Sequence, residues 1–345
     1  MKSIRIHTHG DYDALRVEDL PRPSLGAGEL LLEMRYSALN HLDTWVRRGV
    51  PGHKFPLPIT PGSDGSGIIA ELGEGVEGFE VGERIAIAPG YSCGECPACL
   101  EGNDHYCRRY GIFGESTDGC QCEYFVLPVA NALKIPDALS LEAAAAIPLV
   151  FLTAWEMLVA KARIREGDTV LVHAAGSGVG SASIQIARHF GARVIATAGS
   201  EAKLEKAREL GAHETINYID EDFAKEVRRI TEKRGVDIVV EHTGAATFAG
   251  SLRSLAGGGR IVTCGATSGA EITADLRPIF FKNLAILGST MGRRDTLPEI
   301  LRLAAEGVFQ AVIDRILPLE NVADAHRAIA ERAQTGKVLL EIENH

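Results

Sequence analysis

The sequence predicts an α/β protein in which a β-rich region precedes a doubly wound parallel sheet. Two observations on the 345-residue chain support this class. Up to about residue 130, short apolar stretches such as SGIIAELG and ERIAIAPG are interrupted by Gly and Pro, which is typical of successive short strands. From about residue 150, apolar β-branched runs alternate with helical patterns, which is typical of a parallel sheet covered on both faces.

Length and charge restrict the classes of function. A chain of 345 residues is long enough for two domains, each with its own core. The formal net charge of -10 argues against nucleic acid as a partner, because phosphate binding needs a basic face. No export signal is visible in MKSIRIHTHG, so we expect a cytoplasmic protein. The apolar run 141–160 contains Glu142, Pro148 and Glu156, which predicts a buried helix and no membrane partner.

The segment TVLVHAAGSGVGSASIQIARHF predicts a dinucleotide-binding turn. A strand is expected to end near Ala174 and a helix to begin near Gly178, with glycines that let the backbone approach a pyrophosphate. A second strand, ARVIATA, follows at the expected distance. The alternative is a glycine-rich turn without a ligand. The predicted cofactor-binding residues are Thr153, Ala175, Gly176, Ser177, Gly178, Val179, Gly180, Ser200, Lys203 and Gly265.

The end of the second predicted strand favours NADP(H) over NAD(H). An NAD-binding unit usually places an acidic side chain there for the ribose hydroxyls, whereas this chain has Ala198. Without that carboxylate a 2′-phosphate is not repelled, and Ser200 and Lys203 could bind it. Lys203 could equally be a solvated helix residue. Use of both coenzymes stays open.

Four cysteines at close spacing predict one structural zinc ion per chain. Cys93, Cys96, Cys99 and Cys107 lie within a single loop, and zinc accepts four thiolates in a closed tetrahedral site. With every position filled by sulfur, no place remains for water or substrate. An iron–sulfur cluster and unmetallated thiols are the alternatives. Clustered cysteines without an export signal also favour the cytoplasm.

The chain closely resembles the medium-chain dehydrogenase/reductase superfamily, which contains zinc alcohol dehydrogenases and quinone oxidoreductases. The resemblance rests on PGSDGSGIIAELGEGVEGFEVGERIA, the four-cysteine lobe, AGSGVG and the closing GKVLLEI. It implies a GroES-like catalytic domain, 1–130 and 290–345 with a zinc lobe at 93–107, and a Rossmann domain at 131–289. It also implies a cleft at the domain junction and a homodimer or homotetramer.

The chain departs from the family pattern at the residues that bind the catalytic zinc in alcohol dehydrogenases. Where the family motif CHTD supplies the first ligand, this chain reads NHLD and has Asn40. The second ligand position holds Ser63, and the third falls at Leu149 or Val150. Leu42 replaces the hydroxyl of the proton relay. Asn and Ser are poor zinc ligands and Leu is none, so the sequence predicts a site without catalytic zinc.

Hydride transfer without a Lewis acid suits an acceptor that delocalises the incoming charge, such as a quinone or an α,β-unsaturated carbonyl. We therefore expect an NAD(P)H-dependent reductase of such small molecules. In this hypothesis Asn40 and Ser63 orient the substrate oxygen, and Asp43 or Asp64 shapes the network or relays a proton.

The sequence is also compatible with three other functions. One is a zinc-type alcohol dehydrogenase with rearranged ligands drawn from His41, Asp43 or Asp64. Another is an enoyl- or acryloyl-CoA reductase, which needs a basic entrance for the nucleotide phosphates. The third is a non-catalytic protein that binds the coenzyme as a sensor, which tight NADPH binding without turnover would favour.

Overall fold

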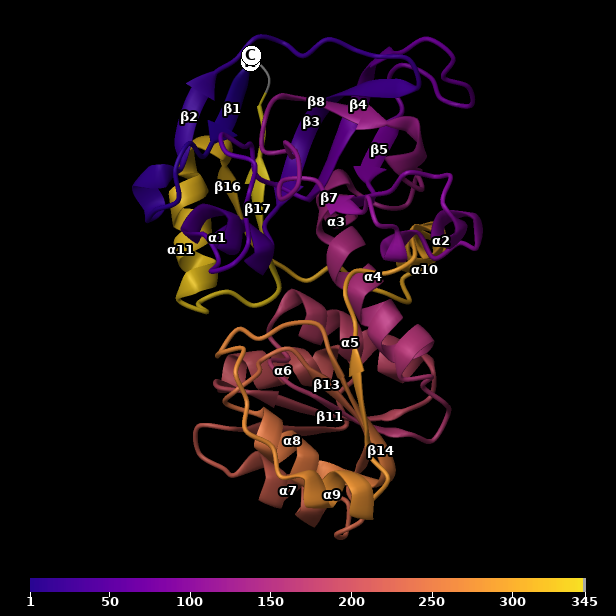
Figure 1. The fold of residues 1–345 in the computed structure, drawn as a ribbon, viewed down its shortest axis with the longest axis vertical. Coiled ribbons are helices and arrows are strands. Elements are labelled where there is room, and N and C mark those ends of the chain that lie inside the picture. Colours follow the sequence, from indigo (N-terminus) through magenta and orange to yellow (C-terminus); the bar gives the residue numbers. More distant parts are fainter. Residues whose placement is uncertain (344–345) are drawn as a thin grey trace. The chain divides into compact units, whose positions relative to one another are not determined.

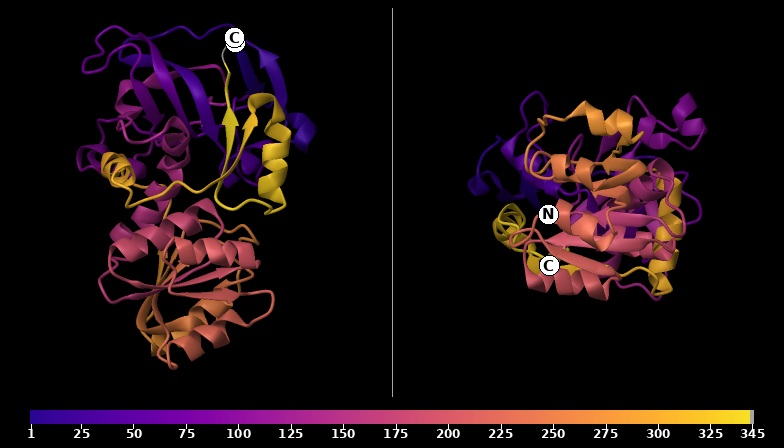
Figure 2. Two further views of the ribbon diagram at one scale, coloured as in Figure 1. Left: turned by 180° about the vertical axis from the view of Figure 1, so that it is seen from behind. Right: turned by 90° about the horizontal axis from the view of Figure 1, so that it is seen from below.

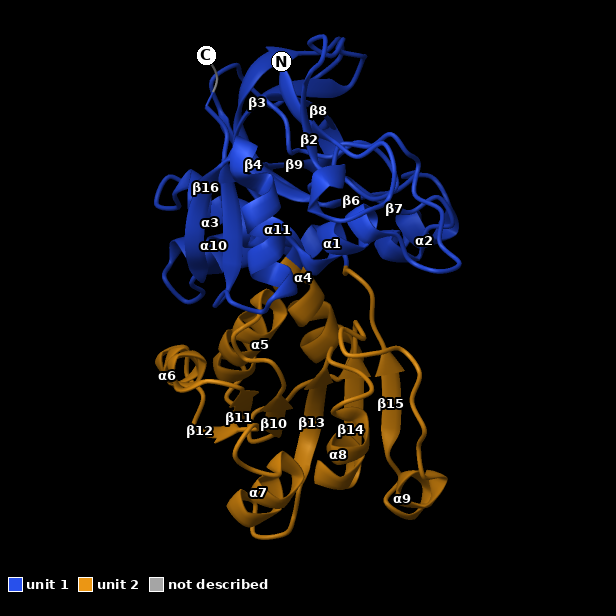
Figure 3. Ribbon diagram, turned by 90° about the vertical axis from the view of Figure 1, so that its left-hand side faces the viewer, with its two compact units in different colours: residues 1–149, 293–345 blue, residues 150–292 orange. Residues whose placement is uncertain are grey.

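The computed structural model describes residues 1–343, which form two compact units (Figure 3). One unit contains residues 1–149 and the chain from residue 293 onward, and the other contains residues 150–292. The first boundary falls at 149/150, later than the expected 130/131. The reason is that helix α3 (Leu141–Ala146) packs on the sheet of the first unit, where Ser66 Oγ donates to Leu141 O at 2.7 Å.

The first unit is built on a seven-stranded sheet in the order β16-β17-β3-β4-β5-β9, with β8 also paired to β3 (Figure 1). These strands are β3 (Glu29–Ala38), β4 (Asp64–Leu72), β5 (Arg84–Ile87), β8 (Tyr124–Pro128), β9 (Ala132–Lys134), β16 (Ile313–Pro318) and β17 (Lys337–Glu341). Strand β17 comes from the C-terminal part of the chain and pairs antiparallel with β3. The GroES-like domain therefore draws on both ends of the chain.

Smaller elements surround this sheet. The short strands form two pairs, β1 (Lys2–Arg5) with β2 (Arg16–Asp19) and β6 (Gly90–Tyr91) with β7 (Gly111–Ile112). The helices are α1 (His41–Arg48), α2 (Pro97–Leu100), α3, α10 (Leu297–Ala305) and α11 (Val322–Ala330). Single 3₁₀ turns are η1 (Tyr12–Ala14), η2 (Asp104–Tyr106), η3 (Val129–Asn131), η5 (Arg294–Thr296) and η6 (Leu319–Asn321).

The second unit is a six-stranded sheet in the order β12-β11-β10-β13-β14-β15, and every pair in it is parallel. Helices α5 and α6 cover one face, and α7, α8 and α9 cover the other (Figures 1 and 2). The strands are β10 (Thr169–Val172), β11 (Arg193–Ala198), β12 (Glu214–Asn217), β13 (Val236–Glu241), β14 (Leu255–Thr263) and β15 (Ala285–Gly288). The helices are α5 (Gly178–His189), α6 (Glu201–Glu209), α7 (Phe223–Ile230), α8 (Phe248–Ser254) and α9 (Leu276–Phe281).

Both fold-class predictions are confirmed, because the β-rich and parallel-sheet regions lie where the sequence places them. The parallel strands are buried on both faces, which explains their continuous apolar character: β10 and β11 contain Leu171 and Ile195, each fully buried. The apolar run 141–160 forms α3, α4 (Pro148–Trp155) and the first part of the π-helical η4 (Glu156–Lys161). Within residues 1–343, no helix is both long enough and apolar enough to cross a bilayer.

Candidate functional site

Three neighbouring strands of the first unit bring Asn40, at the first predicted metal-ligand position, together with Asp64 and Lys337. Strand β3 ends just before Asn40, and it pairs with β4 so that Ala38 lies opposite Asp64. On its other side, Ala38 lies opposite Leu339 of β17. Continuing that antiparallel register by two residues places Lys337 opposite Asn40. The sheet register, and not sequence proximity, therefore assembles this site.

Lys337 lies among these residues as a buried cation. Its Nζ donates to Asn40 Oδ1 at 2.5 Å and to Asp64 Oδ2 at 3.0 Å. Asn40 Nδ2 donates to the same Asp64 oxygen at 2.9 Å, and Asp64 Oδ1 accepts from the Leu149 amide at 2.9 Å. The exposed fractions of Asn40, Asp64 and Lys337 are 6%, 0% and 4%. We call these three residues the Lys337 cluster.

Asp43 lies in the first turn of α1 and stabilises the backbone next to the Lys337 cluster. Its Oδ2 accepts from the Asn40 amide at 2.7 Å and its Oδ1 from the Gly62 amide at 3.0 Å. Burial raises the pKa of Asp43 to about 6, while the two amide bonds and the charge of Lys337 limit the increase. Both carboxylate oxygens therefore have structural hydrogen bonds.

Ser63 differs from Asn40, Asp43 and Asp64 because its side chain makes no hydrogen bond with the described residues. The side chain is 1% exposed, and Oγ has no hydrogen-bond partner among the described residues. A buried hydroxyl without a partner costs free energy unless a ligand or water satisfies it. Of the four residues predicted to act in catalysis, Ser63 is the one with hydrogen-bonding capacity left for a substrate oxygen.

The rearranged metal site that the sequence left open finds no geometric support. Within residues 1–343, the four cysteines are the one group of three or more Cys, His, Asp or Glu ligand atoms lying within 4.8 Å of one another. His41 is the first residue of α1, and its ring packs edge-on against that of Trp45 with the ring centroids 5.5 Å apart. Asp43 and Asp64 bind the amides and the ammonium group already described. A divalent cation beside Asn40 would also be repelled by Lys337.

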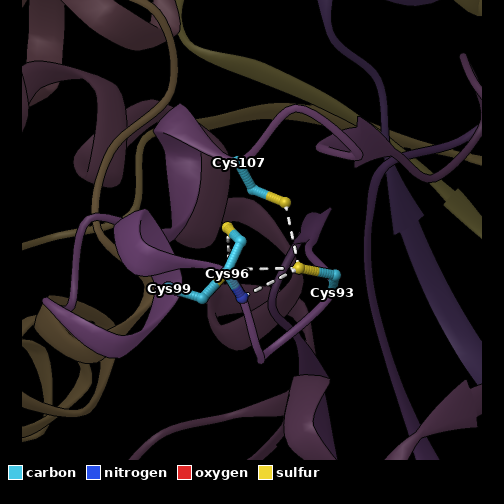
Figure 4. Close-up of side chains that lie close together, drawn as sticks. All are labelled: Cys93, Cys96, Cys99 and Cys107. Atoms are coloured by element: carbon cyan, nitrogen blue, oxygen red, sulfur yellow. Dashed lines mark hydrogen bonds between the residues drawn. The ribbon is translucent and has the colours of Figure 1, made fainter.

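The four cysteines converge as a tetrahedral zinc site requires (Figure 4). The Sγ–Sγ separations are 3.8 Å for Cys93–Cys99, and 3.5 Å for both Cys96–Cys99 and Cys107–Cys93. Zinc–sulfur bonds of about 2.3 Å in tetrahedral geometry put the sulfurs about 3.8 Å apart. The amides of Cys96 and Arg109 donate to Sγ of Cys93 and Cys107 at 3.4 and 3.3 Å, as anionic thiolates favour. The chemistry and geometry of this lobe fit a structural zinc ion.

The glycine turn of the second unit has the geometry of a dinucleotide-binding site. It connects β10 to α5, and Ser177 caps the helix by accepting from the Gly180 amide at 2.9 Å. A Cβ atom at Gly180 would lie 2.3 Å from Ala174 O, so only glycine lets the helix begin this close to the strand. Residues 175–179 form the turn, in which the amides of Ala175 and Ser177 donate to Thr197 O and Ala174 O at 2.9 and 2.8 Å, and the helix N-terminus suits a pyrophosphate.

The end of β11 forms a polar corner beside the turn. The aliphatic part of Lys203 lies over Gly176, where a Cβ would approach its Cδ to 2.7 Å. Ser200 is exposed and precedes α6, and its side chain makes no capping hydrogen bond. The Tyr218 hydroxyl lies over Gly199, where a Cβ would approach it to 2.7 Å. Tyr218 was not among the predicted site residues, because its position after β12 is adjacent only in the folded sheet.

The two remaining cofactor candidates lie in the second unit. Thr153 is in α4 and 5% exposed, and Gly265 follows β14. A Cβ at Gly265 would make only ordinary contacts with His242, at 3.5 Å and beyond, so packing by described atoms does not require glycine there. The sequence also missed Lys337 and His242. The GKVLLEI motif contains Lys337, but nothing in that motif indicates its partners.

Comparison with known proteins supports these observations over nearly the whole chain. A family described as "Alcohol dehydrogenase GroES-like domain" matches residues 26–137, and "Zinc-binding dehydrogenase" matches residues 178–306. A solved structure described as an NAD-dependent alcohol dehydrogenase is 51% identical with a TM-score of 0.96, covering 99% of this chain and 100% of that one.

Two curated relatives have different activities in their names. An acryloyl-coenzyme A reductase from Metallosphaera sedula is 32% identical, covering 99% of both chains. A quinone oxidoreductase from Rattus norvegicus is 30% identical, covering 99% of this chain and 97% of the relative. The chain belongs to the medium-chain dehydrogenase/reductase superfamily and is an NAD(P)-dependent oxidoreductase, which confirms the resemblance.

Proposed function

We propose that this oxidoreductase reduces a quinone or an α,β-unsaturated carbonyl with hydride from NAD(P)H, without a catalytic zinc. The observation that carries the proposal is the Lys337 cluster. At the positions where the superfamily's alcohol dehydrogenases bind zinc, this chain has the Asn40 amide, the Ser63 hydroxyl and an apolar residue. The Asn40 amide contacts a buried ammonium group, Lys337, which also binds the Asp64 carboxylate. None of these groups is a favoured zinc ligand except the carboxylate, which already binds Lys337.

The chemistry follows from where charge develops. When bound, the coenzyme supplies a hydride, and negative charge then develops on the substrate oxygen. The Ser63 hydroxyl donates a hydrogen bond to that oxygen, and the positive charge of Lys337 lowers the energy of the developing anion. Asn40, Asp43 and Asp64 are positioning residues, because their polar atoms hold Lys337 and the adjacent turn. The proton that completes the reduction comes from water.

Zinc content and activity measured on the same preparation test this proposal. The protein is purified without chelator and without added metal, and zinc per chain is determined by elemental analysis. We expect about one zinc, with NAD(P)H-dependent reduction of a benzoquinone or a cyclic enone that survives mild chelation. Two zinc ions per chain, with alcohol oxidation lost when the weaker ion is removed, would overturn it.

Alcohol oxidation is a second candidate, favoured by the 51% identity to a structure described as an NAD-dependent alcohol dehydrogenase. It needs a group that stabilises an alkoxide, which zinc supplies in such enzymes. Assays with primary and secondary alcohols, with both coenzymes and with added zinc, separate the two candidates. Acryloyl-CoA in the same panel tests the activity named for the Metallosphaera sedula relative.

For the coenzyme, we propose a preference for NADP(H). Ser200, Lys203 and Tyr218 surround the end of β11, where the sequence has no carboxylate to bind ribose hydroxyls. Fluorescence titration with NADPH and NADH should give tighter binding of NADPH, and Lys203→Ala should remove most of the difference. Lys206→Ala on the same helix is the matched control, because Lys206 pairs with Glu209. Equal affinities that Lys203→Ala leaves unchanged would contradict this preference.

A further inference from the structure

The order in which strands are added to the parallel sheet reverses at β10. From β10 the chain continues outward to β11 and β12, and it then returns to add β13 on the other side of β10. In open parallel sheets, ligands bind outside the carboxyl ends of the two strands at such a reversal. The loops that follow β10 and β13 therefore flank the expected coenzyme position. Ser177 lies in the first loop and His242 in the second.

A hydrogen bond joins these two loops. His242 Nε2 lies 3.2 Å from Ser177 Oγ, and the same Oγ accepts from the Gly180 amide at 2.9 Å. A serine hydroxyl has two acceptor sites and one proton. If His242 donates through Nε2, both acceptor sites of Ser177 are filled by protein groups. Its proton must then point elsewhere, toward a ligand at the carboxyl edge of the sheet.

We propose that His242 is a positioning residue for the nicotinamide coenzyme. It donates through Nε2 to Ser177 Oγ, and the Ser177 hydroxyl donates its proton to a phosphate oxygen of the coenzyme. In the opposite tautomer Ser177 would donate to His242, and its proton would not be available to the ligand. The proposal deepens the coenzyme binding on which the proposed function also depends, but it does not depend on the substrate.

The backbone around His242 is held firmly enough for this role. Glu241 is fully buried, and its Oε1 accepts from the amides of Thr243 and Gly244 at 2.7 and 3.0 Å. The Ser268 amide donates to Thr243 O at 2.7 Å, which ties the loop to the segment after β14. His242 is 8% exposed, so its ring has little freedom to leave Ser177.

Glu241 also belongs to a second buried network of hydrogen bonds. Glu241 Oε2 accepts from Ser251 Oγ at 2.9 Å, and Ser251 in turn lies 3.0 Å from His173 Nε2. His173 Nδ1 lies 3.0 Å from the Thr197 hydroxyl. Burial lowers the pKa of His173, which fits a neutral ring that donates to Ser251 and accepts from Thr197. This network joins the residue after β10 to β11, β13 and α8 and fixes the position of Glu241, which precedes His242.

A double-mutant cycle on coenzyme affinity tests the proposal. The variants are His242→Phe, Ser177→Ala and the double variant, titrated with whichever of NADPH and NADH the wild type binds more tightly. Each single change should weaken binding about tenfold, the cost of one hydrogen bond to a charged group. The double variant should also be about tenfold weaker, because both changes remove the same interaction. His242→Gln, which keeps an N–H donor, should restore most of the affinity.

Adenosine is the control ligand, because it lacks phosphate and should bind all variants equally. Circular dichroism and thermal unfolding identify a variant that has lost its fold, and His242→Leu, which also lacks an N–H donor, then serves in the cycle instead of His242→Phe. Independent effects that multiply to about a hundredfold in the double variant would overturn the proposal. An equal loss of adenosine binding would overturn it too, since it would assign His242 a purely structural role. Neither readout uses a substrate, so failure here is distinct from failure of the proposed reductase activity.

Discussion

The cysteine lobe and the Lys337 cluster are the two places in the first unit where this superfamily can hold zinc, and they are built in opposite ways. The lobe draws its four sulfurs from residues 93–107, so a single loop supplies a complete set of soft ligands. The Lys337 cluster joins residues 40, 64 and 337 across three strands and supplies its own positive charge. One site needs a metal to neutralise its thiolates, and the other has an internal cation.

This difference teaches that charge balance distinguishes the two places, because the cysteine lobe needs an added cation and the Lys337 cluster does not. Four thiolates close together repel one another until a cation binds between them. In the Lys337 cluster the Asp64 carboxylate already has an ammonium partner at 3.0 Å. Removing the cation from either site should therefore be costly. The cysteine lobe fits a zinc ion as that cation, whereas the Lys337 cluster has a lysine side chain.

The largest effect is expected in the cysteine lobe. Cys107→Ser removes one ligand, so zinc content should fall from about one per chain toward zero, and stability should drop by roughly 4 kcal/mol or more. Elemental analysis and thermal unfolding measure the two quantities. Cys264→Ala, which lies in the other unit, is the control and should keep its zinc. A zinc content that is unchanged in Cys107→Ser would contradict the assignment of Cys107 as a zinc ligand.

Lys337→Met should come next, because it leaves Asp64 buried without its cationic partner. Breaking a buried ion pair from one side costs about 3–5 kcal/mol, which urea unfolding can measure. The double change Lys337→Met with Asp64→Asn removes the uncompensated charge and should recover part of that loss. A single Lys337→Met variant within 1 kcal/mol of wild type, on the order of a surface change, would contradict the assigned ion pair.

Asp43 should make the folding stability depend on pH, with an effect of intermediate size. Its folded pKa of about 6 lies above the ordinary 3.8, so the folded state binds the proton more tightly than the unfolded state. Stability from this group is thus present below about pH 4 and is lost as pH rises to 6, by about 3 kcal/mol in total. Asp43→Asn should lack this change between pH 4 and 6 in denaturant titrations. An identical pH profile in both proteins would show that Asp43 does not titrate in this range.

Ser63→Ala should have the smallest effect on stability. The hydroxyl has no partner among the described residues, so its removal should leave stability unchanged or raise it by up to about 1 kcal/mol. Activity should nevertheless fall about a hundredfold in kcat, because the hydrogen bond to the substrate oxygen is lost. Steady-state kinetics and unfolding on the same sample test both statements. Unchanged kcat would remove Ser63 from the reaction.

The sequence could predict those parts of the site that depend on local spacing. The cysteine lobe and the glycine turn each lie within one short segment, and the turn geometry at Gly180 follows from strand and helix patterns nearby. The absence of zinc ligands at Asn40 and Ser63 could also be seen by comparison with the family motif. The boundary at 149/150 could not, because it depends on how α3 packs on the sheet of the first unit.

Lys337, Tyr218 and His242 show what only tertiary structure decided. Lys337 meets Asn40 because β17 returns from the far end of the chain and pairs with β3 in one particular register. Tyr218 lies over Gly199 and His242 meets Ser177 because parallel strands bring their carboxyl ends to one edge. By itself the sequence determined the fold class, the four-cysteine lobe and the glycine turn between β10 and α5, since these follow from periodicity and local spacing. Strand order and register decided the charge balance of the candidate site, because they set which distant side chains share a buried environment.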